Sequence, residues 1–250
     1  MKIFNPYTII CVLAHAEITL ATSSTAECGH TDNHAGEALI RAALGGRTDT
    51  VNLLVQSPTY FSADHTGKAL IQAARGGHTA IIVILLRRPL RIYNIHAGEA
   101  LIEAALRGHT DAVNLLVNSP REISADHTGK ALIQAARGGR TSIIEILLRF
   151  PFHIRIHNDY AGGALIGAAL GGHTDAVNLL VQSPKYFSAD HTGKALIQAA
   201  TGGHTAIIEI LLNCRTRISD NHVGEAIQTA VIGGHNKIVT ALQAYIASRS

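Results

Sequence analysis

The feature that most constrains this chain is a repeat of about 31 residues that runs through most of its length. The sequence of Ser62 to Pro89 recurs almost unchanged from Ser124 to Pro151, and a third copy begins at Ser188. The stretches between these copies form a second, related sequence type. A fixed period in this range is typical of a stacked array, in which each unit buries its apolar faces against its neighbours.

Seven units follow one another when a shared glycine is taken as the start of each. The steps between these glycines are 31, 31, 31, 33, 31 and 31 residues, and the two types alternate. The glycines are Gly36, Gly67, Gly98, Gly129, Gly162, Gly193 and Gly224.

One unit is predicted to hold two short helices. In the fourth unit, Lys130 to Arg137 has apolar residues at helical spacing, and Gly138-Gly139 breaks the helix where a positive φ is accessible. Thr141 is predicted to cap the second helix. Prolines should end the second helices, because a proline cannot continue a helix. They are Pro58, Pro89, Pro120, Pro151 and Pro184.

Composition predicts an all-α solenoid with a core of small side chains. Apolar residues make up 47% of the chain, aromatics only 4%, and tryptophan is absent, so the core must be Ala, Ile, Leu and Val. Paired alanines in the first helix let backbones approach closely. The second helix has one regularly polar position, which we expect to face solvent. Its residues are Asn52, Asn114, Asn178, Glu145 and Glu209.

These units resemble the ankyrin repeat. The family pattern of paired alanines, Gly-His and paired aliphatics is met by Ala73-Ala74, Gly77-His78, Ile81-Ile82 and Leu85-Leu86. Two departures stand out: Lys-Ala-Leu-Ile or Glu-Ala-Leu-Ile replaces the family's Thr-Pro-Leu-His, and the unit is about two residues short. An aspartate three residues before the unit glycine resembles the start of an ankyrin unit. These aspartates are Asp64, Asp126 and Asp190.

The chain divides into an N-terminal extension, residues 1–33, and a repeat domain, residues 34–250. The extension has two interpretations. Thr8 to Leu13 echoes a second helix and would be a degenerate capping half-repeat, whereas the apolar run from Tyr7 to Ala14 loosely resembles a signal peptide. With the first interpretation we expect a cytoplasmic protein. With the second, the protein would be secreted or would act in a host cytosol.

Repeated histidines and a lysine-containing motif resemble metal-binding or phosphate-binding sites, but they occur at the same positions in several repeats. His-Thr-Gly-Lys at His65, His127 and His191 lacks the first glycine and the final hydroxyl of a phosphate loop. Eleven of the fifteen histidines form two ladders, one two residues before the unit glycine, which includes these three, and one after the turn. Equivalent positions about 10 Å apart are too distant to share a metal ion. We therefore expect the imidazoles to bond backbone groups of the turn between the helices, and we expect no metal site.

Catalysis is not expected, because every candidate His or acid has equivalents in other units, whereas an active site is unique. Three separated cysteines give no disulfide framework, and a net charge of +3 with scattered Lys and Arg does not indicate nucleic-acid binding. No run approaches the length of a membrane span. We expect no cofactor and a monomer.

In the last unit, polar residues should cap the array; they are Gln228, Thr229, Asn236, Lys237, Thr240 and Gln243.

Binding residues are expected where the repetition breaks, in the segments between units that hold most of the aromatics and many arginines. The candidates there are Tyr60, Arg91, Tyr93, Arg121, Phe152, His153, Arg155, Tyr160, Lys185 and Tyr186. Of the charged ones, Arg91, Arg121, Arg155 and Lys185 should be exposed, whereas Phe61, Phe150 and Phe187 could equally pack beneath a neighbouring loop. The ankyrin resemblance implies binding by the first helices as well. One variable position there carries Arg41, Gln72, Glu103, Gln134 and Gln198.

The function predicted from these observations is a non-enzymatic scaffold that holds a partner protein against a concave face and the loops between repeats. Three alternatives remain at this point. They are an exported ankyrin-type effector directed at a host, a structural or regulatory spacer without a stable partner, and an enzyme or nucleotide binder that uses the lysine-bearing segments.

Overall fold

The computed structural model describes residues 31–57, 61–87, 90–149, 157–183, 188–214 and 216–249, and every regular element in these ranges is an α-helix. The chain divides into two compact parts, Met1–Ile123 and Ser124–Ser250, which we call unit 1 and unit 2 and describe separately. The 31-residue units of the sequence are called repeats from here on, and the glycine that starts each repeat keeps the name unit glycine. Both interpretations of the N-terminal extension rest on residues outside the described ranges. The first described helix begins at Thr31, three residues before the predicted start of the repeat domain.

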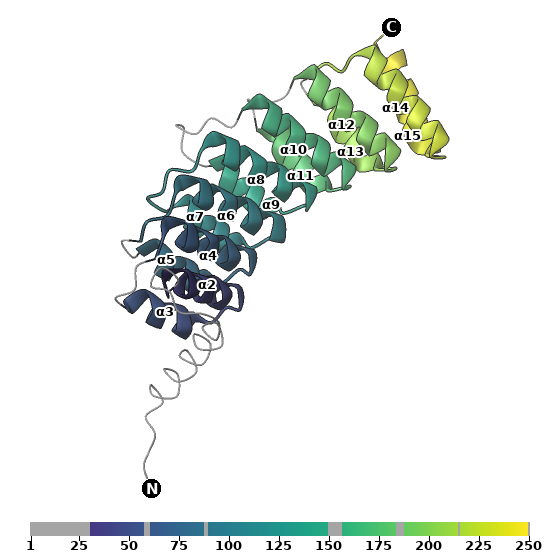
Figure 1. Cartoon of the computed structure of the whole chain (residues 1–250). Coiled ribbons are helices and arrows are strands. Elements are labelled where there is room, and N and C mark those ends of the chain that lie inside the picture. Colours follow the sequence, from purple (N-terminus) through teal and green to yellow (C-terminus); the bar gives the residue numbers. More distant parts are fainter. Residues whose placement is uncertain are drawn as a thin grey trace. The chain divides into compact units, whose positions relative to one another are not determined.

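The helices alternate between the first and second helix of each repeat (Figure 1). In unit 1 they are α2 (Thr31–Leu44), α3 (Thr48–Gln56), α4 (Ala63–Arg75), α5 (Thr79–Arg87), α6 (Asn94–Arg107) and α7 (Thr110–Val117). In unit 2 they are α8 (Ala125–Arg137), α9 (Thr141–Arg149), α10 (Asn158–Leu170), α11 (Thr174–Gln182), α12 (Ala189–Thr201), α13 (Thr205–Leu212), α14 (Asp220–Ile232) and α15 (Asn236–Ala247).

The first helices are longer than predicted. In the fourth repeat the helix begins at Ala125, five residues before the predicted start at Lys130, and the unit glycine Gly129 lies inside it. Ser124 is the N-cap, and its side chain accepts a hydrogen bond from the backbone N–H of His127. This cap satisfies one of the free N–H groups at the helix start, so the helix can begin there.

The turn between the two helices confirms the predicted glycine conformation. In each repeat the residue before the histidine or arginine of the turn is a glycine with φ between 64° and 82°. The predicted threonine cap is wrong, because the second helix already includes the threonine. In α7 the N-cap is His109, whose side chain makes no capping bond. The second helices end two or three residues before the prolines at 58, 89, 120, 151 and 184, as expected from the absence of a proline N–H.

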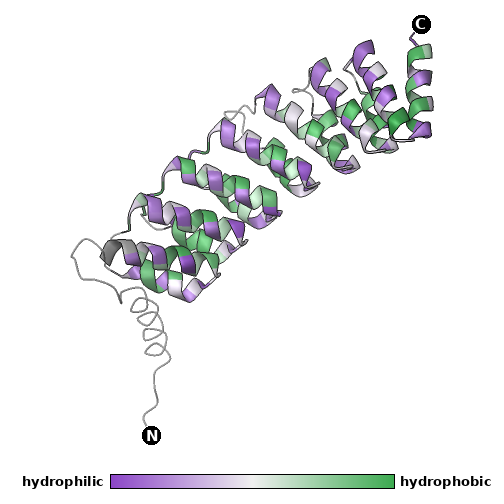
Figure 2. Cartoon of the chain, turned by 45° about the vertical axis from the view of Figure 1, so that its right-hand side comes forward, coloured by the Kyte–Doolittle hydropathy of each residue, from purple (hydrophilic) through white to green (hydrophobic). Residues whose placement is uncertain are grey.

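Within each unit, first helices pack on first helices and second helices on second helices. In unit 1, α4 lies between α2 and α6, and α5 lies between α3 and α7. In unit 2 the orders are α8, α10, α12, α14 and α9, α11, α13, α15. The paired alanines of the first helices are almost completely buried, as expected of residues packed between neighbouring first helices. Hydrophilic residues gather at the starts of the first helices (Figure 2).

Apolar residues in the segments between repeats complete the core. Phe61, Ile92, Ile123 and Ile218 are buried, each two residues before the start of a first helix. Phe150 and Phe187 lie outside the described residues. The predicted solvent-facing position of the second helices is exposed at Asn114, Asn178, Glu145 and Glu209 and half-buried at Asn52.

The last helix pair is only partly polar. Gln228, Asn236, Lys237, Thr240 and Gln243 are exposed and Thr229 is half-buried, as expected of a capping unit. Val231 and Ile232 are nevertheless 59% and 87% exposed.

Candidate interaction surface

The histidines two residues before the unit glycines pack against the preceding repeat. A Cβ atom on Gly67 would come within 2.0 Å of the His96 ring, and one on Gly162 within 2.2 Å of the His191 ring. At Gly224, in the last repeat, nothing lies within 4 Å. These glycines are therefore needed because an imidazole of the next repeat occupies the space of a side chain.

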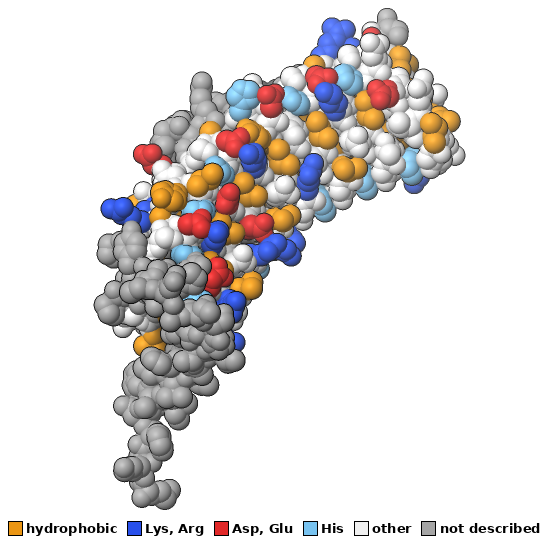
Figure 3. All heavy atoms as spheres, viewed as in Figure 1, with side chains coloured by type: hydrophobic (Ala, Val, Ile, Leu, Met, Phe, Trp, Pro, Cys, Tyr) orange, Lys and Arg blue, Asp and Glu red, His pale blue; other side chains and the backbone are white. Residues whose placement is uncertain are grey.

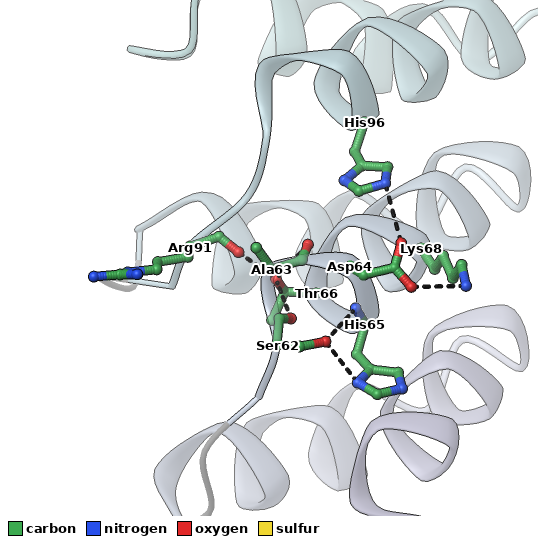
Figure 4. A network of polar contacts seen from close by, with 8 residues as sticks. All are labelled: Ser62, Ala63, Asp64, His65, Thr66, Lys68, Arg91 and His96. Atoms are coloured by element: carbon green, nitrogen blue, oxygen red, sulfur yellow. Dashed lines mark hydrogen bonds and ion pairs between the residues drawn. The ribbon is translucent and has the colours of Figure 1, made fainter. Parts of the chain in front are cut away.

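The same histidines connect neighbouring repeats through side-chain polar groups (Figure 4). Ser62 Oγ lies 2.8 Å from His65 Nδ1, while Asp64 lies 2.7 Å from Lys68 Nζ and 3.5 Å from His96 Nε2. The prediction that these imidazoles bond backbone groups of the turn is wrong for this ladder. Their partners are a serine of the same repeat and an aspartate of the preceding one.

Hydrogen bonds from lysine side chains lower the pKa of two aspartates, Asp64 and Asp190. The Lys68 ammonium holds the pKa of Asp64 below its ordinary value of 3.8, and Asp64 in turn raises the pKa of Lys68 above 10.5. In unit 2, a hydrogen bond from Lys194 lowers the pKa of Asp190 in the same way. These groups are about half exposed, so the pairs serve as modest links along a helix.

The His-Thr-Gly-Lys motifs lie inside helices. Residues 65–68 belong to α4, so their backbone N–H groups are not arranged as a loop around a phosphate. Thr66 is buried, and its hydroxyl donates to the carbonyl of Arg91, while the carbonyls of Ser62 and Ala63 also lie within hydrogen-bond distance. The motif is thus part of the helix start and of the connection to the next loop.

The second histidine ladder bonds backbone groups at the end of a first helix. Nε2 of His78, His109 and His173 lies 3.3, 3.1 and 2.9 Å from the carbonyls of Leu44, Arg75 and Arg137, each in the preceding repeat. For these histidines the predicted backbone role is confirmed. Among the described residues, no group of three His, Cys, Asp or Glu side chains is placed to hold a metal ion.

The variable position of the first helices lies on the accessible side of each unit. Arg41 is exposed, and the four others are half-buried; they are Gln72, Glu103, Gln134 and Gln198. Arg75 Nε lies 3.3 Å from Glu103 Oε2, an ion-pair distance, although the geometry does not make a hydrogen bond. In the fifth repeat the equivalent residue is Gly167, and the Arg137 side chain lies across it.

Exposed leucines beside this position were missed by the sequence analysis. Leu44, Leu106 and Leu170 are 54%, 43% and 54% exposed near the ends of first helices. The sequence held a signal for their exposure, because the other repeat type has arginines, Arg75 and Arg137, at the equivalent position. On the face shown in Figure 3, hydrophobic side chains lie among Lys, Arg, Asp and Glu side chains.

The loop candidates divide into free and structural residues. Arg91 and Tyr93 are exposed, as expected of binding residues. Arg121 is half-buried and donates to the carbonyls of Leu90 and Ile92, so its predicted exposure is wrong.

Tyr160 also has a structural role, because it stands in the histidine ladder. Its hydroxyl donates to Asp126, and its ring occupies the space beside Gly129. The remaining loop candidates lie outside the described residues; they are Tyr60, Phe152, His153, Arg155, Lys185 and Tyr186.

Comparison with known proteins identifies the fold. The family model for ankyrin repeats, in three copies, matches residues 165–248. The chain has the ankyrin-repeat fold. The crystal structure of the human ASB11 ankyrin repeat domain is similar over 78% of this chain and 96% of that one, with 21% sequence identity and a TM-score of 0.55. No curated protein sequence matches the chain.

The ankyrin fold explains the alternation of the two helix types and the turn glycines that the repeats share. The family model covers the last third of the chain, and the similarity to the solved structure concerns the fold. In the part of the chain that the structure describes, no helix is both long and apolar enough to cross a membrane.

Proposed function

We propose that this protein is a non-enzymatic scaffold that binds a partner protein through a concave face formed by its first helices and through the loops between repeats. The observation that carries the proposal is the contrast between the two sides of the first helices. The packed side has the same alanines in almost every repeat, while one position on the accessible side changes from Arg41 to Gln72 to Glu103 in successive repeats. A surface that varies on a constant frame is suited to recognising one partner at many points.

The exposed leucines support the same proposal. Leu44 and Leu106 in unit 1, and Leu170 in unit 2, are exposed apolar side chains, and the charged residues Arg41 and Glu103 stand three positions before the first two of them. Apolar groups within a polar rim are characteristic of protein interfaces.

The test is a binding measurement on variants of the accessible side. The partner is first captured from native extract by cross-linking and then purified. Arg41→Glu combined with Gln134→Arg and Gln198→Arg should weaken its binding at least about tenfold, because these changes alter charge within the contact area.

The matched control carries Asn114→Arg and Asn178→Arg on the exposed side of the second helices. Both proteins should keep the helicity of the wild type by circular dichroism. Equal loss of binding in both proteins would reject the first-helix surface, and failure of the wild type to retain any protein would reject the scaffold function.

A further inference from the structure

The start of α6 differs from the starts of the other first helices. In α4, α8, α12 and α14 the N-cap is a serine whose hydroxyl accepts from the backbone N–H of the histidine three residues later. In α6 the N-cap is Tyr93, which makes no side-chain capping bond. In α10 the N-cap His157 also makes none, but Tyr160 replaces the ladder histidine there. Among the first helices whose N-cap is described, only α6 keeps the histidine and lacks the serine.

This substitution leaves a buried polar atom without a partner. His96 Nδ1 is buried, and within the described residues no group forms a hydrogen bond with it. The Tyr93 ring lies 5.8 Å from the His96 ring but offers no hydroxyl to Nδ1 in the way that a serine does. Loss of a cap and an unsatisfied buried nitrogen both destabilise the fold. Where a local rule is broken without compensation, a function for the residue present is the expected reason.

Two residues at the start of α6, Tyr93 and Ile95, are exposed and are of types found at binding sites. Tyr93 is 60% exposed and Ile95 is 53% exposed. Ile92 is buried in the extended segment before α6, so Arg91 and Tyr93, its neighbours on either side, are directed away from the core. Figure 4 shows the Arg91 guanidinium extending away from the polar network around Asp64.

The backbone of this segment is held in place by hydrogen bonds. Arg121 donates to the carbonyl of Leu90 at 3.0 Å and to that of Ile92 at 3.4 Å, and Thr66 donates to the carbonyl of Arg91. A loop that is already fixed loses little conformational entropy when a partner binds. Tyr93 and Arg91 are therefore presented on a preorganised support.

The charge around Tyr93 selects the kind of partner. The segment before Tyr93 holds three arginines, Arg87, Arg88 and Arg91, and no acidic residue; the nearest acids are Glu99, on α6, and Asp64, which pairs with Lys68 at 2.7 Å. Arg87 and Arg91 are exposed. An acidic partner segment would be complementary to this charge, and a basic one would be repelled.

We propose that Arg91, Tyr93 and Ile95 form a docking surface for an acidic protein segment that carries an apolar anchor side chain. Tyr93 and Ile95 contact the anchor, and Arg91 pairs with a carboxylate of the segment. This inference rests on the proposed scaffold function and assigns one of its contact points and the chemistry of the partner.

The test uses a random peptide library displayed on phage and selected on the full chain. Enriched peptides are synthesised, and their affinity is measured for the wild type, for Tyr93→Ser, for Arg91→Glu and for the control Arg217→Glu. Arg217 is an exposed arginine at the equivalent place in the segment before α14. Tyr93→Ser separates binding from folding, because it restores the capping serine and should raise the melting temperature while removing the contact.

The expected result is enrichment of peptides that combine Asp or Glu with an aromatic or aliphatic residue. Their affinity should fall at least about tenfold for Tyr93→Ser and for Arg91→Glu, and should stay unchanged for Arg217→Glu. Enriched peptides that bind Tyr93→Ser as tightly as the wild type would overturn this docking surface and leave the scaffold function intact. Enrichment of basic peptides would overturn the assigned partner class. If no peptide is enriched, the docking surface is rejected, while the partner capture described above still decides the scaffold function.

Discussion

At the scale of single residues, pairs of glycine and imidazole link several neighbouring repeats within each unit. The glycine inside the first helix leaves room for the ring, and the ring in turn reaches the aspartate of the preceding repeat, as with Gly67, His96 and Asp64. Alanine is the better helix former at such a position, so glycine is explained by this contact and not by helix propensity.

The glycine pair can be tested against a matched site. Gly67→Ala should destabilise unit 1 by about 1–3 kcal/mol, because the new methyl group would overlap the His96 ring. Gly224→Ala, in the equivalent place of α14, meets nothing within 4 Å and should stabilise the fold by about 0.5–1 kcal/mol. Urea unfolding followed by circular dichroism measures both changes. A similar effect of the two substitutions would contradict the role of the imidazole.

The lowered pKa of Asp64 gives a pH dependence of known sign. Because the pKa of Asp64 is lower in the folded state, its pairing with Lys68 stabilises the fold above the ordinary pKa of 3.8 and is lost as pH falls through the lowered value. The effect should be small, since both side chains are about half exposed. Urea midpoints measured from about pH 7 downward should fall less steeply below about pH 4 for Asp64→Asn than for the wild type. An identical slope would show that the pair does not contribute.

At the scale of elements, the serine N-cap decides where a first helix begins and fixes the histidine at the same time. Ser188 accepts from the backbone N–H of His191 at 3.2 Å and lies 2.8 Å from its Nδ1. One hydroxyl therefore joins the helix start to the contact between repeats.

Removing this hydroxyl should affect both functions. We expect Ser188→Ala to destabilise unit 2 by about 1–2 kcal/mol through the lost cap and the unpaired imidazole nitrogen. Hydrogen exchange of the first turn of α12 should become faster, while Ser142→Ala, an exposed serine in α9, should change neither quantity. Unchanged exchange in Ser188→Ala would mean that the cap does not hold the helix start.

At the scale of the whole molecule, a position inside the stack and the same position in the last repeat have different environments. Ala200 on α12 is completely buried, because α12 lies between α10 and α14. Val231 is the equivalent residue of α14 and is 59% exposed. The fold is thus a sum of contacts between successive repeats.

This difference predicts opposite outcomes for the same substitution. Ala200→Glu should destabilise unit 2 by about 3 kcal/mol or more, because it buries an unpaired charge in a tightly packed contact. Val231→Glu should change the stability by no more than about 0.5 kcal/mol. Thermal unfolding by circular dichroism distinguishes the two, and strong destabilisation by Val231→Glu would show that this end of α14 is covered in solution.

The repeat, the helix pair, the glycine turn and the proline stops could all be predicted from the sequence. These features depend on backbone conformations that single residues favour or forbid, so they can be found without knowing what lies nearby. The alanine pairs were also readable, because their periodic spacing shows the packed side of the first helix.

Which side chains are free to bind became visible only from the packing of the repeats. Arg121 and Tyr160 looked like binding residues, but their partners stand 29 to 34 residues earlier in the chain. The histidines likewise bond groups in the preceding repeat. Leu44 and Leu106, by contrast, were not among the predicted binding residues and proved exposed. Whether a side chain is free depends on the neighbouring repeat, since packing places beside each residue groups that are distant in sequence.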